Sequence, residues 1–352
     1  MTGTLARDAV DAVDAVDVVL AELFEDRVRR AARHGEQYAL LWRRLARSVE
    51  GGKRLRPRLL LDTHRAFGDP HPQDAAVAGA AFELLHTALL LHDDVLDQDR
   101  SRRGRLNLTG EFTQDAQADL PPRTADAWGE ASGILGGDLL LSAAHALLAR
   151  VRPAAYEALS ALVDECLFRA AAGEHADVAF ALGTVPATPE GLVRMMEDKT
   201  GGYSFAAPLR AGAALADAGE QADAELERVG TALGVLYQLR DDLLGVFGDA
   251  RRTGKSTTGD LREGKRTLLV AFAEGHPAWT AVRHRWGAPD LDADDADALR
   301  AALVASGARD ATERLVESRR REVVDLIGGT ALPTALRHHL TDLADRIVDR
   351  DS

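Results

Sequence analysis

The sequence predicts an all-α protein. Aromatic residues make up only 5% of the 352 residues, while Ala and Leu abound, and this composition suits packed helices better than sheets. No run of alternating β-branched residues indicates a strand. The length permits one large domain or two smaller ones. Because no linker is long enough to separate two domains, we expect one domain over residues 1–352.

Four helices are expected before the first acidic motif ends. Residues 6–32 open with the repeat DAVDAVDAVD, whose three-residue spacing still places the apolar side chains in one stripe on a helix. Low-complexity disorder is the alternative interpretation of this stretch. Glycines and prolines then divide the chain, and the following helices are expected at 36–49, at 55–67 and from 73 to the aspartates.

The remainder is also expected to be helical. Residues 104–122 are interpreted as a loop that ends in two prolines. Gly201 and Gly202 should break or kink the helix that contains them, and the polar segment 249–260 should separate two helical stretches. The expected helices include one that carries ASGILGGDLLLSAAHALLAR, those at 154–180, 188–216 and 219–248, and at least three more up to residue 352.

Charge and cysteine content favour a cytoplasmic protein. The net charge of −13 should repel nucleic acid and anionic membrane surfaces. A single cysteine, Cys166, excludes an intramolecular disulfide and suits a reducing compartment. It lies in a helical, Ala-rich run, where a buried inert thiol is expected. The N-terminus has no signal pattern, and no stretch reaches about 18 uncharged apolar residues, so secretion and membrane spanning are not expected.

The most informative stretch is LLLHDDVLDQDRSRRG, residues 89–104. Its spacing places Asp93, Asp94 and Asp97 along one edge of a helix, at the C-terminal end, where the helix dipole disfavours carboxylates. A cation should compensate these charges. Oxygen ligands without His or Cys favour Mg²⁺ held partly by the phosphates of a ligand. A solvated acidic helix end is the alternative for this motif taken alone.

Five further polar clusters interrupt apolar helices. Basic side chains after two glycines at a helix start suit an anion such as phosphate. Two carboxylate groups with several separated cations imply two anionic ligands, although salt-bridge networks would give a similar set of residues. The clusters are Lys53 with Arg54 and Arg56; Arg102 with Arg103; Lys199 with Thr200; Gln238 with Asp241 and Asp242; and Lys255 with Lys265.

These residues resemble the trans-isoprenyl diphosphate synthases, the polyprenyl synthetase family, and most of all its bacterial geranylgeranyl diphosphate synthases. GGKRLRP, HDDVLDQDRSRRG, KTGG and YQLRDDLLGVFGDARRTGKSTTGDLREGKRT match the motifs of the family in order, over residues 51–267. The resemblance implies one helical bundle around a deep central cavity, usually as a homodimer. It also implies the Mg²⁺-dependent condensation of isopentenyl diphosphate with an allylic diphosphate through ionisation, condensation and elimination. The released diphosphate would act as the base, without a protein nucleophile.

The resemblance also implies residue roles. Asp93, Asp97 and Asp241 would hold three Mg²⁺ ions, with Asp94 and Asp242 supporting them. The contacts to the allylic diphosphate would be Arg102, Lys199 and Lys255, with Thr200, Gln238 and Lys265 lining the same region. The isopentenyl diphosphate site would comprise Lys53, Arg56, His86 and Arg103. His86 alone would be interpreted as a core histidine. His92 would be a packing residue or a residue that supports the site residues from behind.

Two features bear on how far the resemblance extends. Gly245 stands where many members have a third aspartate in the second motif, so the metal binding there depends mainly on Asp241. Ala88 and Leu89, five and four places before the first aspartate, are not aromatic, and the growing chain should pass the C15 stage. We expect a C20 geranylgeranyl product, with C15 or C25 and longer products as alternatives.

Two other classes of function share part of this pattern. A terpene cyclase also uses a DDxxD motif and Mg²⁺, but it has no need of GGKRLRP or of a second diphosphate site. The other class is a weakly active partner subunit of a heteromeric synthase, and Gly245 is the only feature of the sequence that favours it.

Overall fold

The all-α prediction is confirmed. The computed structural model describes residues 2–102, 104–248 and 259–350. Within these ranges the strands are limited to one hairpin of β1 (Ser101–Arg102) and β2 (Arg105–Leu106), and the other elements are helices. Contacts divide the chain into a first unit, Met1–Val163 with Pro208–Asp223, and a second unit, Asp164–Ala207 with Ala224–Ser352.

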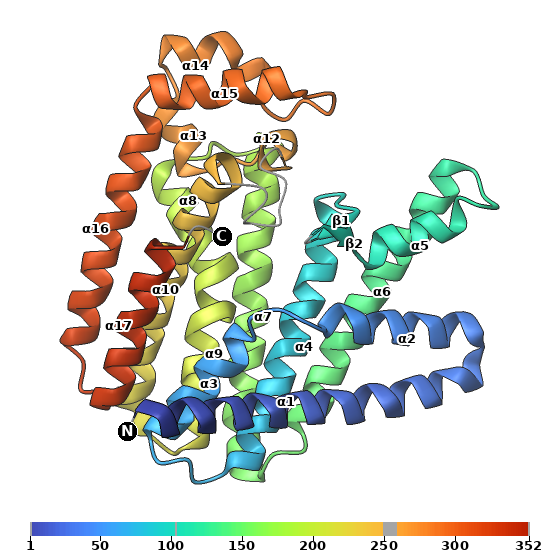
Figure 1. Cartoon of the computed structure of the whole chain (residues 1–352), viewed down its shortest axis with the longest axis vertical. Helices are drawn as coiled ribbons and strands as arrows, with labels where there is room; N and C mark the ends of the chain where they lie inside the picture. Colours follow the sequence, from blue (N-terminus) through green and yellow to red (C-terminus); the bar gives the residue numbers. More distant parts are fainter. Residues whose placement is uncertain (1, 103, 249–258, 351–352) are drawn as a thin grey trace. The chain divides into compact units, whose positions relative to one another are not determined.

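The first unit contains the N-terminal helices, drawn from blue to green in Figure 1. The predicted helices at 36–49 and 55–67 are observed to within one residue at their ends. The elements are α1 (Thr2–Ala31), the 3-10 turn η1 (Ala32–His34), α2 (Glu36–Val49), α3 (Leu55–Ala66), α4 (Pro72–Leu96), α5 (Leu108–Ala116), α6 (Pro122–Leu148) and the start of α7 (Pro153–Ala181).

The core of the first unit forms where α4 packs on α6. Two glycines of α6 allow this approach, since a Cβ at Gly137 would lie 2.1 Å from Nε2 of His92 and one at Gly133 would lie 2.6 Å from a methyl group of Val95. His92 therefore packs against α6, which is one of the two roles expected for it. Both helices are long and apolar enough to cross a membrane by composition, but 72% and 50% of their most apolar windows are buried inside the protein. Their apolar character serves the core of this unit.

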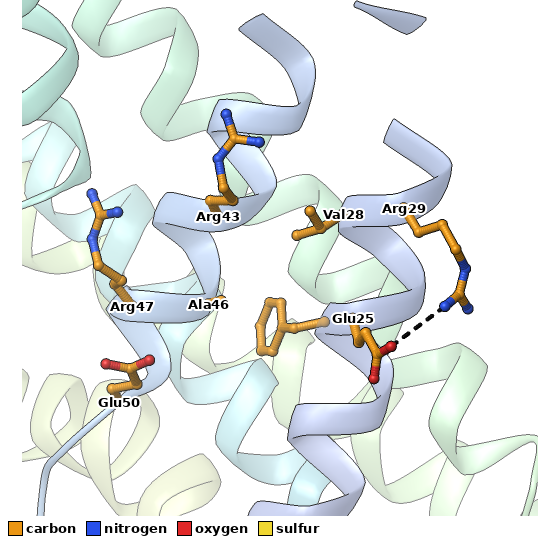
Figure 2. Close-up of a pocket in the computed structure, with 8 residues that line it drawn as sticks. Glu25, Val28, Arg29, Arg43, Ala46, Arg47 and Glu50 are labelled. Atoms are coloured by element: carbon orange, nitrogen blue, oxygen red, sulfur yellow. Dashed lines mark ion pairs between the residues drawn. The ribbon is translucent and has the colours of Figure 1, made fainter. Parts of the chain in front are cut away.

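A hollow of about 580 Å³ lies between α1 and α2, as Figure 2 shows. Phe24, Val28 and Ala46 form its apolar lining, and three arginines surround it. Each arginine has an acidic partner: Arg29 pairs with Glu25 and Asp26, Arg43 with Glu36, and Arg47 with Glu111. The charge around this hollow is thus largely balanced, and none of the predicted site residues lines it.

The prediction of a loop over residues 104–122 is wrong. The chain forms β2 and then α5, whose N-terminus is capped by the Asn107 side chain accepting a hydrogen bond from the backbone nitrogen of Gly110. Leu108 and Phe112 are buried, and Phe112 meets Trp128 of α6 edge-on. An Asn cap followed by an apolar pair four residues apart is a sufficient helix signal, which the polar composition of the segment obscured.

The second unit contains the C-terminal part of α7, α8 (Pro189–Met196), the π-helix η2 (Glu197–Ala206) and most of α10 (Gly219–Phe247), while α9 (Ala207–Leu215) lies almost wholly in the first unit. The glycine pair predicted to break or kink a helix instead lies inside the π-helix, and helical structure continues through it. A π-helix has one more residue per hydrogen-bonded turn and is frequent at functional sites. The sequence pattern did not predict this change from an α-helix to a π-helix.

The remaining helices confirm the expected helical C-terminal region. They are α12 (Gly259–Glu263), α13 (Leu268–Ala273), α14 (Pro277–Val282), the 3-10 turn η3 (Arg283–Arg285), α15 (Ala293–Ala305), α16 (Ala308–Gly328) and α17 (Thr334–Val348). Helices α16 and α17 lie side by side (Figure 1). Most of the predicted polar segment 249–260 lies outside the described residues.

Candidate active site

The first acidic group occupies the C-terminal end of α4. Asp93 and Asp94 lie in the last turn and Asp97 is the C-cap residue. Carboxylate oxygens of Asp93 and Asp97 lie within 4.8 Å of one another, which is close enough for both to contact one metal ion. Two of the three aspartates predicted along one helix edge, Asp93 and Asp97, thus lie close together. Asp94 differs from its neighbours because it is buried.

Arg102 compensates this group from the β-hairpin. Its Nε and Nη2 donate to Oδ1 of Asp94 at 2.9 and 2.6 Å, and Nη2 also donates to Oδ2 of Asp93 at 3.2 Å. Burial raises the pKa of Asp94, against the opposing effect of Arg102. Burial would lower the pKa of Arg102, but the charges of Asp94 and Asp93 raise it above its ordinary value. Arg102 therefore stays charged and neutralises part of the carboxylate charge.

The basic residues predicted at the start of α3 have different roles. Arg54 is structural, since its guanidinium contacts Asp17, Glu83 and the carbonyl oxygen of Val49 at 2.8, 2.8 and 2.7 Å. Lys53 is exposed just before α3, and Arg56 is half-buried in the first turn of α3. His86 is half-buried on α4, two helical turns before Asp93. These four side chains all belong to the first unit.

In the second unit, Lys199 contacts two acidic side chains of α7. Its Nζ lies 2.7 Å from Oδ2 of Asp177 and 2.9 Å from Oε2 of Glu174. The approach of α7 is close, because a Cβ at Gly173 would lie 2.3 Å from the backbone nitrogen of Lys199. Sequence reasoning missed Glu174 and Asp177. Their spacing of three within a helix was the only available signal, and such pairs are common on helices.

A hydrogen-bond chain connects the π-helix with α10. The hydroxyl of Thr200 donates to Oε1 of Gln238 at 2.9 Å, and Nε2 of Gln238 donates to Oδ1 of Asp242 at 2.8 Å. Burial raises the pKa of Asp242 to about 8, against the effect of the Gln238 hydrogen bond, and the charges of Asp260 and Asp241 add to the rise. The three predicted residues thus form one connected set, with Asp242 as its buried end.

Asp241 contacts the C-terminal segment. Arg350 donates from Nη2 to Oδ1 of Asp241, and its guanidinium carbon lies 4.6 Å from the centre of the Tyr237 ring. Arg240 holds the backbone in place by donating from Nε and Nη2 to the carbonyl oxygen of Arg350 at 3.1 and 2.8 Å. Sequence reasoning missed Arg350, because nothing in its local sequence distinguishes it from other arginines near a chain end.

The other predicted residues of this region follow α10. Lys265 lies 2.8 Å from Glu263. Gly245 is covered by the side chain of Asp260, the second residue of α12. Two predicted site residues, Arg103 and Lys255, lie outside the described residues. Each unit therefore holds part of the predicted site. In the first unit the first acidic group pairs with Arg102. In the second unit Asp241 pairs with Arg350, and Lys199 pairs with Glu174 and Asp177, three partners that were not predicted.

The donor set fits a hard divalent cation. The candidate ligands of both groups are carboxylates, and Mg²⁺ prefers oxygen ligands and usually keeps part of its coordination for phosphates and water. The nearby cationic side chains suit a diphosphate, because its negative charge can bind both metal ions and basic side chains. An all-α fold with two aspartate groups, each near cationic side chains, could therefore bind a diphosphate through metal ions.

Comparisons with known proteins agree with this class. The sequence pattern of the polyprenyl synthetase family matches residues 40–286. Geranylfarnesyl diphosphate synthase of Aeropyrum pernix is 33% identical over 310 residues, which cover 85% of this chain and 91% of that protein. (2E,6E)-Farnesyl diphosphate synthase of Mycobacterium tuberculosis is 32% identical over 309 residues, covering 86% and 80%. The crystal structure of geranylgeranyl pyrophosphate synthase from Corynebacterium glutamicum, complexed with isoprenyl diphosphate and magnesium, superimposes with a TM-score of 0.89 at 26% identity, covering 96% of this chain and 98% of that one.

The chain belongs to the polyprenyl synthetase family. It is a trans-prenyltransferase of isoprenoid biosynthesis, with the all-α isoprenoid synthase fold. The family is magnesium-dependent, and prenyl diphosphates fit it as substrates. The family resemblance noted from the sequence motifs is therefore confirmed.

Proposed function

We propose that this prenyltransferase condenses isopentenyl diphosphate with allylic diphosphates and releases geranylgeranyl diphosphate, a C20 product. The observation that carries the proposal is that each of two carboxylate groups lies at a helix segment together with its own cationic side chains. Such a set can bind two diphosphates, one through metal and one through direct ion pairs. A terpene cyclase has no need of the second diphosphate site.

We assign the metal-binding role to Asp93, Asp97 and Asp241, with three Mg²⁺ ions as the expected number. When bound, the metal neutralises the diphosphate that leaves the allylic substrate and thereby stabilises the departing charge. Asp94 and Asp242 orient the neighbouring ligands. Arg102, Lys199 and Lys255 contact the allylic diphosphate directly, while Thr200, Gln238 and Lys265 line its site.

The isopentenyl diphosphate site in this proposal consists of Lys53, Arg56, His86 and Arg103. Lys53 and Arg56 flank the start of α3, where free backbone N–H groups add to the attraction for an anion. Guanidinium groups suit phosphate oxygens because they donate two parallel hydrogen bonds. His86 lies on α4, in the same first unit as Lys53 and Arg56.

Product length is proposed from the residues that precede the first aspartate. Ala88 is fully buried on α4, and Leu89 beside it is half-buried. Neither is aromatic, so neither should stop the chain at C15. The names of the relatives include C15, C20 and C25 synthases, which makes the small residue at 88 the main reason for choosing a product beyond C15.

We further propose that the chain acts as a single domain, forms a homodimer and works in the cytoplasm. Support for association comes from α6, which exposes large apolar side chains: Trp128 is 43% exposed, Ile134 47% and Leu135 54%. Such side chains favour a protein partner when they lie on one element. The lone thiol, Cys166, is buried, and a protein without disulfides suits a reducing compartment.

The test is to incubate the purified protein with isopentenyl diphosphate and farnesyl diphosphate in the presence of Mg²⁺. Diphosphate release is measured and the extracted prenyl alcohols are sized by chromatography. A main C20 product is expected. A product that stops at C15 when geranyl diphosphate is supplied would contradict the assignment of Ala88 and Leu89. Absence of turnover with every allylic diphosphate would favour a partner subunit over a synthase.

A further inference from the structure

Arg169 of α7 connects three elements of the second unit. Its Nε donates to Oδ1 of Asp198, in the first turn of the π-helix, at 3.0 Å, and its Nη1 donates to Oε1 of Glu227 on α10 at 3.5 Å. A Cβ added to Gly202 would lie 3.8 Å from both Nε and Cζ of Arg169. The guanidinium is thus close to two positions of the π-helix that are four residues apart.

These three charged side chains are partly shielded from solvent. The side chain of Arg169 is 25% exposed, and those of Asp198 and Glu227 are 26% and 38% exposed. Partly buried ion pairs are screened less by water and salt than pairs at the surface. The contacts of Arg169 can therefore help to hold α7, the π-helix and α10 in one arrangement.

Asp198 and Lys199 are adjacent in the chain, and both pair with α7 but with opposite polarity. Asp198 pairs with Arg169, whereas Lys199 pairs with Glu174 and Asp177. A single ion pair would leave the first turn of the π-helix free to rotate against α7. Two pairs made by adjacent residues, with partners at different heights on α7, restrict both the rotation and the position of this turn.

The two pairs should respond differently to a diphosphate. In the proposed function Lys199 contacts the allylic diphosphate, so its ammonium group exchanges or shares its acidic partners with phosphate oxygens. The pair between Arg169 and Asp198 contains no proposed site residue and can persist. It then keeps the first turn of the π-helix against α7, where a Cβ at Gly173 would lie 2.3 Å from the backbone nitrogen of Lys199.

We propose that Arg169 is a positioning residue for Lys199, acting through its ion pair with Asp198. The inference rests on the proposed contact between Lys199 and the allylic diphosphate. A lysine whose backbone is held in place loses less conformational freedom when it binds the diphosphate. The effect is specific to the allylic diphosphate, because the described side chains proposed for isopentenyl diphosphate belong to the first unit.

Substitutions can separate positioning from a purely structural role. Arg169→Met removes the charge and keeps much of the side-chain length, and Asp198→Asn removes the partner charge. Lys199→Met reports whether Lys199 contacts the diphosphate at all. Arg320→Met is the matched control, because Arg320 is 29% exposed, belongs to the second unit and pairs with acidic side chains of both α16 and α17.

The measurement is isothermal titration calorimetry of the full-length protein with Mg²⁺ and either farnesyl thiodiphosphate, a nonreactive allylic analogue, or isopentenyl diphosphate alone. Arg169→Met should raise the Kd of the analogue about threefold or more and leave the Kd of isopentenyl diphosphate within about twofold of the parent. Adding Asp198→Asn to Arg169→Met should cause little further weakening, because both changes remove the same ion pair. Arg320→Met should lower thermal stability without changing either Kd.

A parental Kd for the analogue in folded Arg169→Met, when Lys199→Met weakens binding, would overturn the proposal. Equal weakening of both ligands would also overturn it, since Arg169 would then be only structural. Asp198→Asn should shift the Kd of the analogue in the same direction, and it makes the same test if Arg169→Met does not fold. An unchanged Kd in Lys199→Met would instead contradict the proposed role of Lys199 itself, so the two failures are distinguishable.

Discussion

At the scale of single residues, ion pairs decide how the predicted site is arranged. The motifs predicted which positions carry carboxylates and which carry cations. They did not predict that Arg102 pairs with Asp94 and Asp93, or that Lys199 pairs with Asp177 and Glu174. These partners depend on how the hairpin approaches α4 and on how α7 packs against the π-helix. The spacing of residues in the sequence does not determine how closely these elements approach each other.

The contact between Arg350 and Asp241 leads to a prediction about metal affinity. A guanidinium on a carboxylate competes with a metal ion for the same oxygen, so Arg350→Gln should lower the Mg²⁺ concentration for half-maximal rate. An ion pair with this partial exposure is worth up to about 1 kcal/mol, which corresponds to about a two- to fivefold change. A Mg²⁺ titration of diphosphate release measures it, with the exposed Arg346→Gln as control. A higher Mg²⁺ requirement would show that Arg350 assists metal binding.

At the scale of elements, helix positions followed from periodicity and from Gly and Pro breaks. The bounds of α2, α3, α7 and α10 agree with the sequence to within a residue or so. The α5 segment was missed because its helix signal is a cap and two apolar residues. The π-helix was missed because its extra residue per turn is a consequence of packing, with Gly201 and Gly202 inside it and α10 against it.

The packing of α10 against the π-helix depends on Gly234. A Cβ there would lie 2.3 Å from the Cα of Gly201, and a backbone atom has little freedom to move away. Gly234→Ala should separate the two elements, break the hydrogen bonds that connect Thr200, Gln238 and Asp242, and destabilise the protein by about 1–3 kcal/mol. Denaturant unfolding and kcat measure both effects.

The control is Gly328→Ala, because a Cβ at that position on α16 meets no atom within 4 Å. This variant should be neutral or slightly stabilised, since Ala favours helices over Gly. If Gly234→Ala retains both parental stability and parental kcat, the close approach of the two backbones is not required for the hydrogen-bond chain.

At the scale of the whole molecule, the sequence was sufficient for the fold class and for the family. Both follow from long-range regularities: helical periodicity over the chain and several motifs in a fixed order. The division into two compact units depends on which helices contact one another, and the sequence pattern holds no such information. The product length depends on a few side chains such as Ala88, and for that reason it stays a proposal.

The central claim is that the aspartate groups hold the metal that drives departure of the diphosphate. The most direct measurement is the rate of diphosphate release by Asp93→Ala as a function of Mg²⁺ concentration, with the exposed Asp119→Ala as control. Loss of this ligand should lower kcat/KM by about a hundredfold or more, equal to about 2.7 kcal/mol of transition-state stabilisation. The control should match the parent. An Asp93→Ala rate within about threefold of the parent, at the same Mg²⁺ requirement, would contradict the account.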